Sequence, residues 1–421
     1  MTEIQRYRRP VRQQGLVELL RLLGRLRPLG LPCLVGLVLL GCSSDDSDEL
    51  DIEKSFPVEF MGAVTPYEEA VESSPADAAA MARGVTRAWE PPSGYSLMNP
   101  QEQTIGVFLT EDGEEPLKGF FYKGSGSWHT TLDMDKVRAI TYYLYGYVPH
   151  SSGVSCTISP NSTYSDGAVL SIKNLPAVTS NDVCVVVGAK NGYESGYSAS
   201  GNYSITGLRR GDFAYAAASG ATSNNYVFLL FDHLYASFNV RMKVAGEYNA
   251  LRTIKLKELR LQTSSNGTVT KKRHDATVTL RATASAATDP ISSIVFTPVG
   301  TDAGDGSMFL SPNPLTLTTS YSDYTGYFMP SGVDKLELTS IYDVYDKKGN
   351  LTRENCKATN TINISMFNLQ EETARGVKYS VSMTIQPTYL YVLSDPDLDN
   401  PTVVVSPTPS PSRKGEGSYI P

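Results

Sequence analysis

The stretch "HLYASFNVRMKV", His233–Val244, alternates between apolar and polar side chains along nearly its whole length. A period of two is that of a β-strand with one buried face, because successive side chains of a strand point to opposite faces of the sheet. The pattern therefore predicts a half-buried strand whose inward side chains are Leu234, Ala236, Phe238, Val240, Met242 and Val244.

Similar patterns recur along most of the chain. In "TIKLKELRLQT" the phase changes between Leu256 and Leu259, which indicates a β-bulge, and "DKKGN" at Asp346–Asn350 has the chemistry of a hairpin turn. The 25 Tyr and 13 Phe residues also favour strands. We therefore predict an all-β protein of tandem β-sandwiches.

The 421 residues suffice for two ordinary domains. The segment "AAASGATSNN", residues 216–225, is a candidate junction, which gives an N-terminal domain at 88–225 and a C-terminal domain at 226–405. The remaining residues, 406–421, are rich in Pro and Ser and are expected not to fold.

The net charge of −7 is unevenly distributed. Residues 1–41 carry seven Arg and two Glu, a local charge of +5, so the rest of the chain carries −12. Phosphate binding needs clustered Lys and Arg, and the acidic body has no such stripe, so nucleic acid is not an expected partner. The short run "KKRH" at Lys271–His274 is expected to be a solvated turn.

Residues 29–40, "LGLPCLVGLVLL", follow an Arg-rich start and are too few to span a bilayer as a helix. This length is typical of the apolar part of a signal peptide, so residues 1–41 are a predicted leader. The run ends in "LLGC", Leu39–Cys42, which resembles the lipobox of bacterial lipoproteins and implies acylation of Cys42. The alternative is a buried core segment with an incidental cysteine.

The acidic run "SSDDSDELD" after Cys42 cannot bury apolar surface and predicts a solvated tether. It also resembles the signal that sends lipoproteins of Bacteroides-type bacteria to the outer face of the outer membrane, although a generic linker is the alternative. Next, "SFPVEFMGAV" predicts a short strand with Phe56, Val58 and Phe60 on one face. Residues 65–95 then form a predicted exposed loop that contains Arg83 and Arg87.

No catalytic or metal-binding motif is recognisable. His233 stands beside Asp232 but near no nucleophile motif, and no Cys/His spacing supports a metal site or cofactor. We therefore predict that the protein is not an enzyme. Cys156 and Cys184 lie in one predicted domain and are candidates for a disulfide, which would leave Cys356 unpaired.

Taken in order, these features resemble the fimbrillins, the type V pilus subunits of Bacteroides-type bacteria. The lipobox, the acidic tether, the strand-like segment and a loop ending in "TRAW" (Thr86–Trp89) precede two β-rich halves. Within those halves, "LLFDHLYASFNVRMKV", "GYFMPSG" (Gly326–Gly332) and "VKYSVSMTIQPTYLYVLSDPDLDNP" also resemble fimbrillin segments. The resemblance extends from Cys42 to about Pro401.

The resemblance implies two transthyretin-like β-sandwich domains and a maturation route. An arginine-specific protease would cut after Arg87, with Arg83 as second choice, and make Ala88 the new N-terminus. The N-terminal strand would then leave a groove that a strand of another subunit fills, and the charge would change from −12 to −4. The strand donated to a neighbouring subunit is expected to be C-terminal, and its candidate inward residues are Val377, Tyr379, Val381, Met383 and Ile385. The segments "TYLYVL" and "PTVVVS" are alternative donor strands.

The implied partners are other pilus subunits, outer-membrane lipid through Cys42 before cleavage, and a receptor on a host or bacterial surface. The implied location is the outer membrane surface and then the fimbrium. One alternative is a pilus anchor or tip subunit. Another is a surface glycan-binding lipoprotein with a stacking platform of Trp89, Trp128 and tyrosines, and a surface hydrolase is a third.

Overall fold

The computed structural model describes residues 55–70, 89–98, 103–124, 126–151, 153–197, 203–217, 226–304, 307–308, 315–367, 373–389 and 396–407. The predicted leader, Cys42, the acidic tether, Arg83, Arg87, Ala88 and most of the Pro/Ser-rich tail lie outside these ranges.

Within the described residues the protein is almost entirely β, as predicted. The helical elements are α2 (Gly246–Leu251) and the short 3-10 segments η2 (Met134–Lys136) and η3 (Ile364–Phe367). None of the helices in these ranges is long and apolar enough to cross a membrane.

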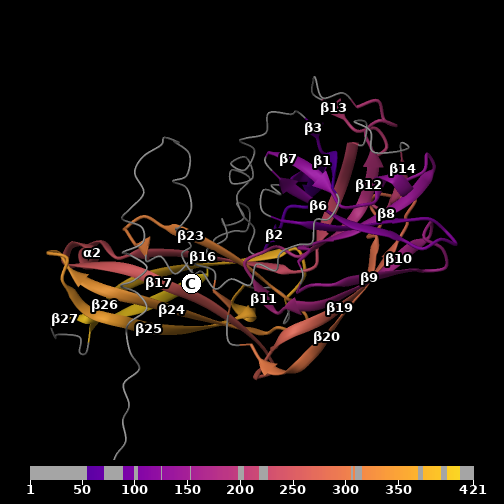
Figure 1. The fold of residues 1–421 in the computed structure, drawn as a ribbon. Helices are drawn as coiled ribbons and strands as arrows, with labels where there is room; N and C mark the ends of the chain where they lie inside the picture. The colour runs from indigo at the N-terminus through magenta and orange to yellow at the C-terminus, as the bar shows by residue number, and fades with distance from the viewer. Residues whose placement is uncertain are drawn as a thin grey trace, which may run out of the picture. The chain divides into compact units, whose positions relative to one another are not determined.

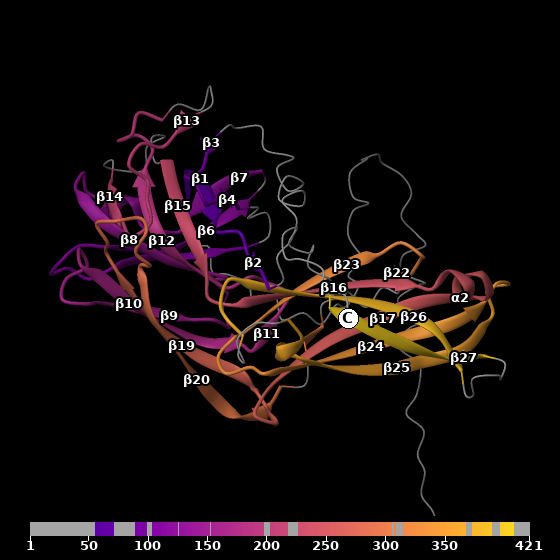
Figure 2. The ribbon, with the colours of Figure 1, turned by 180° about the vertical axis from the view of Figure 1, so that it is seen from behind.

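The largest sheet has nine strands in the order β12-β15-β1-β7-β6-β5-β8-β14, with β4 paired to β1 (Figures 1 and 2). Because β12 also pairs with β8, the strands from β12 round to β8 close into a ring. The strands of this sheet are β1 (Phe56–Val64), β4 (Ser96–Leu97), β5 (Ile105–Thr110), β6 (Leu117–Gly124), β7 (Ser127–Thr130), β8 (Thr141–Val148), β12 (Cys184–Asn191), β14 (Ala214–Ala216) and β15 (Tyr226–His233).

Alternating side chains of these strands fill one apolar cluster, which includes Val58, Val107, Leu144, Val186 and Leu229. The intervening side chains of several of the same strands point to a second cluster, shared with a four-stranded sheet in the order β20-β19-β10-β9. The strands of that sheet are β9 (Cys156–Pro160), β10 (Gly167–Pro176), β19 (Lys271–Arg281) and β20 (Ile291–Ala303).

Two further sheets of six strands enclose the third apolar cluster. One has the order β11-β23-β16-β26-β2, with β27 on β26, and the other has the order β18-β17-β24-β25, with β21 and β22 on β17. Their strands are β2 (Glu68–Glu69), β11 (Val178–Thr179), β16 (Ala236–Val244), β17 (Arg252–Ser265), β18 (Thr268–Val269), β21 (Ser307–Met308), β22 (Leu315–Thr316), β23 (Ser322–Phe328), β24 (Lys335–Asp346), β25 (Leu351–Asn363), β26 (Val377–Tyr389) and β27 (Pro396–Pro407). A separate pair joins β3 (Trp89–Glu90) and β13 (Tyr203–Ser204).

The expected domain boundary between residues 225 and 226 does not coincide with a boundary between sheets. β15 lies beyond it but belongs to the ring, and the β19–β20 hairpin pairs with β10 of the N-terminal half. In the other direction, β2 and β11 join the sheet of β16 and β26. A loop-like composition at 216–225 therefore did not mark where the sheets separate.

Two local predictions are corrected and two are confirmed. The alternation from Leu234 to Val244 is not one strand, because the chain passes from the ring to another sheet at Leu234–Tyr235 and the new strand begins at Ala236. "KKRH" is the start of β19 rather than a turn, with His274 buried. The bulge after Leu256 and the hairpin turn between Asp346 and Leu351 are present.

The β19–β20 hairpin supplies core side chains to a cluster made mainly by the N-terminal half, which a substitution can test. Leu280 is fully buried there, so Leu280→Ala is expected to lower the free energy of unfolding by about 2–5 kcal/mol. Denaturant unfolding of the full chain measures the change. Val295→Thr is the control, because Val295 of the same hairpin is 56% exposed and both residues suit strands. An equal effect of the two substitutions would contradict this packing.

Candidate functional site: the N-terminal segment and its groove

The N-terminal segment, residues 55–70, begins with the predicted strand, and β1 is paired on both sides. Glu59–Val64 run parallel to Tyr226–Phe231 of β15. On its other side, β1 runs antiparallel to β7 at Phe56–Val58 and to β4 at Ala63–Val64. Because β1 is not at an edge of this sheet, removing it would leave backbone N–H and C=O groups of three neighbouring strands, β15, β7 and β4, without partners.

The inward side chains of β1 fill the ring. Val58 and Phe60 are buried, as the alternation predicted, whereas Pro57 and Glu59 on the opposite face are exposed. The Phe60 ring lies 4.7 Å from the ring of Trp128 and 5.7 Å from that of Phe121, measured between centroids. We call the position between β15 and β7, with its apolar lining, the β1 groove.

Gly62 shows how closely β1 fits its neighbours. A Cβ atom at this position would lie 3.0 Å from the Phe60 ring and 3.3 Å from the Phe231 ring. Ala63, the next residue, is fully buried and belongs to the second cluster. Small residues here let the backbone of β1 pass between large aromatic side chains.

The same segment also reaches the sheet of the C-terminal half. β2 pairs in parallel with the start of β26, where the Glu68 N–H donates to the Gly376 carbonyl at 2.8 Å. Lys378 forms an ion pair with Glu69 at 2.8 Å between Nζ and Oε1. Ala70 is buried in the third cluster. Residues 55–70 thus connect two sheets through backbone pairing.

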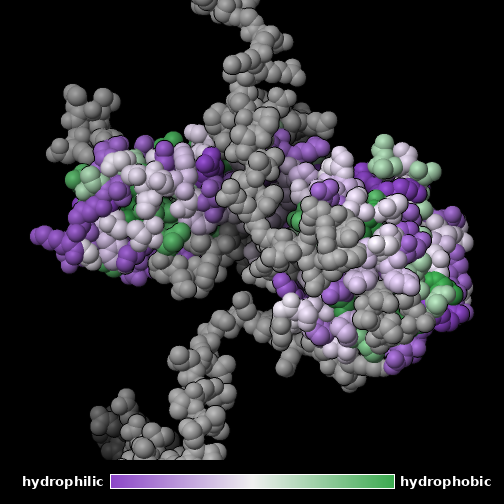
Figure 3. All heavy atoms as spheres, turned by 90° about the horizontal axis from the view of Figure 1, so that it is seen from above, coloured by the Kyte–Doolittle hydropathy of each residue, from purple (hydrophilic) through white to green (hydrophobic). Residues whose placement is uncertain are grey.

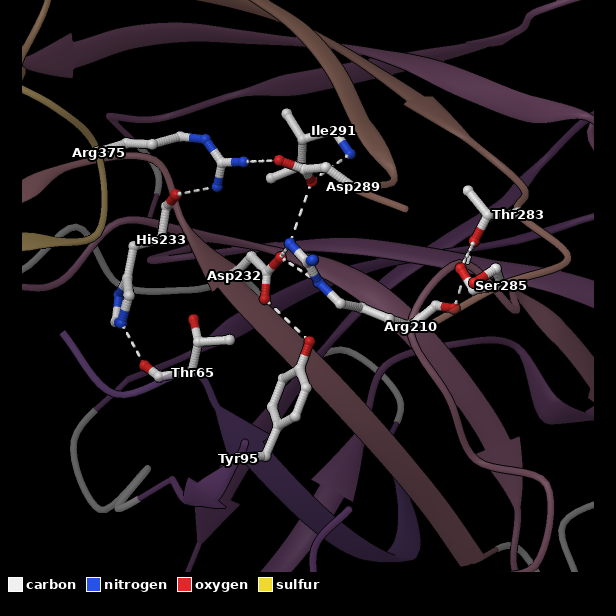
Figure 4. Close-up of polar contacts among 10 residues, drawn as sticks. All are labelled: Thr65, Tyr95, Arg210, Asp232, His233, Thr283, Ser285, Asp289, Ile291 and Arg375. Atoms are coloured by element: carbon white, nitrogen blue, oxygen red, sulfur yellow. Dashed lines mark hydrogen bonds and ion pairs between the residues drawn. The ribbon is translucent and has the colours of Figure 1, made fainter. Parts of the chain in front are cut away.

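Charged groups surround the end of β15 (Figure 4). Arg210 donates from Nε to the buried Asp232 carboxylate at 2.9 Å and from Nη2 to Asp289 at 3.1 Å. Arg375, just before β26, binds Asp289 and donates to the His233 carbonyl at 3.3 Å. Tyr95 donates to Asp232 at 3.0 Å, and burial, with the nearby carboxylate, raises the pKa of this phenol. This network connects the ring, the β19–β20 hairpin and the start of β26.

A second polar cluster lies beside it, covered by the N-terminal segment. The Nδ1 atom of His233 contacts Asp182 and Cys184. Its Nε2 atom lies 2.6 Å from the Thr65 carbonyl, a contact that Figure 4 shows. Burial and then Asp182 raise the pKa of the Cys184 thiol well above its ordinary value. A thiol in that state is a poor nucleophile, so the cluster gives no support to a cysteine hydrolase.

The disulfide between Cys156 and Cys184 is not formed, and both residues are free cysteines. Cys156 is in β9 of the four-stranded sheet, whereas Cys184 is in β12 and belongs to the cluster inside the ring. Cys356 is also free and buries its side chain in the third cluster. Proximity in sequence did not place the two sulfurs on the same sheet.

The predicted C-terminal donor residues occupy the core of their own half. Tyr379, Val381, Met383 and Ile385 are fully buried. β26 pairs with β16, and separately with β2 at its start and with β27 further along. β27 is less enclosed than β26, because among the described residues it pairs with a strand on one side only, which is β26. Val403 is buried and Val404 is exposed, so β27 also has one apolar and one outward face.

The structure gives little support to an aromatic platform for carbohydrate. Trp128 packs against Phe60, and the exposed aromatic side chains among those described are Tyr193 and Tyr321. On the face drawn in Figure 3, hydrophobic residues form small separate patches among hydrophilic ones. The side chain of Trp89 is outside the described part of the chain.

The sequence did not reveal the grouping of Asp182, Cys184 and His233. The first two are close in sequence, but His233 is on another strand, and nothing in the spacing indicates that β12 and β15 are neighbours. Nor did it indicate which strands would flank β1. The pairing of β12 with β15 was the missing information in the first case, and the pairing of β1 with β15 and β7 in the second.

No protein-family model matches the chain, and no curated protein matches it significantly. Solved structures of similar arrangement include a candidate cell adhesion protein of Bacteroides fragilis, with 11% identity and a TM-score of 0.33 over 85% of this chain and 99% of that one. A fimbrial protein of Bacteroides vulgatus has 14% identity and a TM-score of 0.29 over 72% and 91%. The fimbrial anchor protein Mfa2 of Porphyromonas gingivalis has 10% identity and a TM-score of 0.23 over 82% and 96%.

Phe60 is expected to be the main anchor of β1. Phe60→Ala should lower the free energy of unfolding by about 3–5 kcal/mol, because the aromatic contacts inside the ring are lost. It should also speed amide hydrogen exchange at Tyr226–Phe231, which pair with β1. Glu59→Gln is the control on the exposed face and should change stability by less than about 0.5 kcal/mol. Unchanged exchange in the Phe60 variant would mean that other residues retain β1.

Proposed function

We propose that this protein is a structural, non-catalytic subunit of a cell-surface fimbrium, delivered as a lipoprotein through Cys42 and joined to other subunits by strand exchange. The observation that carries the proposal is the place of β1 in the middle of a sheet, with partners on both sides. Both strands of the N-terminal segment precede Arg83 and Arg87, and the next strand in the described part of the chain, β3, follows them. One cut after either arginine would therefore leave residues 55–70 attached to the body by non-covalent contacts alone.

Loss of the segment would create a site for another strand. The β1 groove would then present backbone donors and acceptors of β15 and β7 together with the apolar lining that Val58 and Phe60 now fill. Such a groove is satisfied by β-augmentation, in which main-chain hydrogen bonds give affinity and alternate side chains give specificity. Since those groups are costly to leave unpaired, the opened subunit would strongly favour binding a strand.

Of the two C-terminal strands, β27 is the better donor. If β26 left, the third cluster would lose four fully buried side chains, and the sheet would be divided between β16 and β27. If β27 left, the subunit would lose its pairing with β26 and polar contacts such as that of Arg252 with Asp399 at 2.9 Å. It would also lose the buried side chain of Val403 and the partly buried Leu398 and Val405, but none of the fully buried core side chains. We therefore assign the predicted donor residues of β26 to the subunit's own core and the donor role to β27.

The remaining parts of the proposal come from the sequence. The two halves would be transthyretin-like sandwiches, the acidic tether would direct the lipidated chain to the outer face of the outer membrane, and assembled fibres would mediate adhesion. A subunit that retained its lipid at Cys42 would instead be an anchor, and one without a usable donor strand would be a tip. The N-terminal residue of the protein in sheared filaments separates these roles, because a fibre subunit begins at Ala88.

Treatment of the full chain with an arginine-specific protease is expected to release residues 55–70 and then produce oligomers. Mass spectrometry should find Ala88 at the new N-terminus, and gels without reducing agent should show a ladder that reducing agent does not remove. The double variant Arg83→Gln/Arg87→Gln should remain uncut and monomeric, whereas Arg83→Gln alone should be cut after Arg87 and should polymerise.

A chain that ends before β27 serves as a second control for this experiment. It should be cut and lose its N-terminal segment but stay monomeric, because it can receive a strand and cannot donate one. If the complete chain is cut, releases the segment and still stays monomeric, strand exchange is not its mode of assembly.

A further inference from the structure

Three potential metal ligands meet where β12 and β15 pair. Cys184 is the first residue of β12 and lies opposite His233, the last residue of β15, in the antiparallel register. Asp182 lies two residues before the start of β12. Cys184 and His233 are almost completely buried, and the Asp182 side chain is 16% exposed. The ring of strands thus fixes a thiol, an imidazole and a carboxyl group at one place.

The distances among the three groups suit a small metal ion. His233 Nδ1 lies 2.9 Å from Asp182 Oδ2 and 3.4 Å from Cys184 Sγ, and all three ligand atoms lie within 4.8 Å of one another. Bonds of about 2.0–2.3 Å at tetrahedral angles separate the ligands of a zinc ion by roughly 3.2–3.7 Å. Small side-chain adjustments would therefore be enough to place an ion between them.

The arrangement differs from that of a nucleophile, base and orienting acid. In such a relay the nucleophile and the acid bind opposite nitrogens of the histidine. Here Asp182 and Cys184 both face Nδ1, while Nε2 faces the Thr65 carbonyl at 2.6 Å. Convergence of three donor groups on one point is the geometry of chelation.

Two residues of the N-terminal segment, Thr65 and Tyr67, contact the ligand side chains and orient them. The Thr65 carbonyl faces Nε2 of His233, which favours a proton on that nitrogen and leaves Nδ1 available for a metal. The Tyr67 hydroxyl donates to Asp182 Oδ1 at 2.7 Å, which leaves Oδ2 available, and the Tyr67 ring stacks on the His233 ring at 3.7 Å. Outer partners of this kind orient ligands at metal sites.

We propose that Asp182, Cys184 and His233 form a binding site for one Zn²⁺ ion. Thiolate and imidazole ligands favour zinc over calcium or magnesium, which prefer sites built from oxygen atoms alone. Three protein ligands leave the fourth tetrahedral position for a water molecule. Binding releases the thiol proton of Cys184 to solvent, because the thiolate is the ligand.

The site would also connect metal binding with retention of the N-terminal segment, a consequence that rests on the proposed function. Thr65 and Tyr67 both belong to residues 55–70, so the ligands lose their outer partners when that segment leaves. Since affinity changes are reciprocal, a metal that binds more tightly with the segment in place must in turn stabilise the segment in its groove.

Titration of the full chain with Co²⁺, under a non-thiol reductant, tests the site directly. One equivalent should bind and produce a thiolate-to-cobalt charge-transfer band, and Zn²⁺ should displace it. Cys184→Ser should lose the band, whereas Cys356→Ser, which changes another buried cysteine, should keep it. Tyr67→Phe keeps the stacked ring but removes the hydroxyl, and should weaken binding about 10–100-fold.

Circular dichroism and a thermal midpoint measured with chelator establish that each variant is folded. If Cys184→Ser does not fold, Asp182→Asn takes its place, and its affinity for Co²⁺ should fall. No binding by the full chain, or an unchanged band in the Cys184 or Asp182 variant, would overturn the site and leave a hydrogen-bonded cluster only.

The connection to the segment is measured separately, after cleavage by the arginine-specific protease. Zn²⁺ should slow the release of residues 55–70 and a chelator should restore the rate, while Cys184→Ser should be insensitive to both. If a protein that shows the cobalt band releases residues 55–70 at the same rate with Zn²⁺ and with chelator, the connection is refuted. If the segment never leaves under either condition, the proposed function fails, and the cobalt spectrum still decides the zinc site.

Discussion

The backbone pairing of β1 on both sides is the constraint on which the N-terminal half depends. Strands β12, β15, β7, β6, β5 and β8 can form a closed ring only with a strand between β15 and β7. A closed ring has no free edges, and its interior can be filled from every strand. The cluster inside it accordingly draws side chains from β1 as well as from strands far along the chain. β1 is therefore a structural part of the core of this half.

Periodicity in the sequence was sufficient to predict an all-β protein and several of its strands. It identified β1, with the correct inward face, and the bulge after Leu256, because both depend on the order of apolar residues over a few positions. It could not show that the chain passes from one sheet to another within His233–Val244. The two residues between the strands, Leu234 and Tyr235, are buried like the strand residues that follow them, so the apolar pattern is not interrupted there. An apolar residue in the sequence indicates burial but does not indicate which of two cores the side chain joins.

Pairing between distant strands was beyond the reach of the sequence. The β19–β20 hairpin completes a core formed mostly by earlier residues, and β2 and β11 lie in a later sheet. Such pairings between the two halves depend on side-chain packing between segments that are distant in sequence, and no local pattern encodes that packing. The same limitation hid the cluster of Asp182, Cys184 and His233, whose members belong to neighbouring strands only after the ring has formed.

The parallel pairing of β1 with β15 also has a consequence for the time course of folding. β1 is the first of the described strands in chain order, and its partner β15 comes after most of the N-terminal half. Contacts between such distant segments form slowly, because a long loop must be closed before they contribute any stability. The ring is therefore expected to close late, with β1 as the last strand to find its place. If the proposed strand exchange takes place, the position that the incoming strand fills is thus the one that the folding subunit itself fills last.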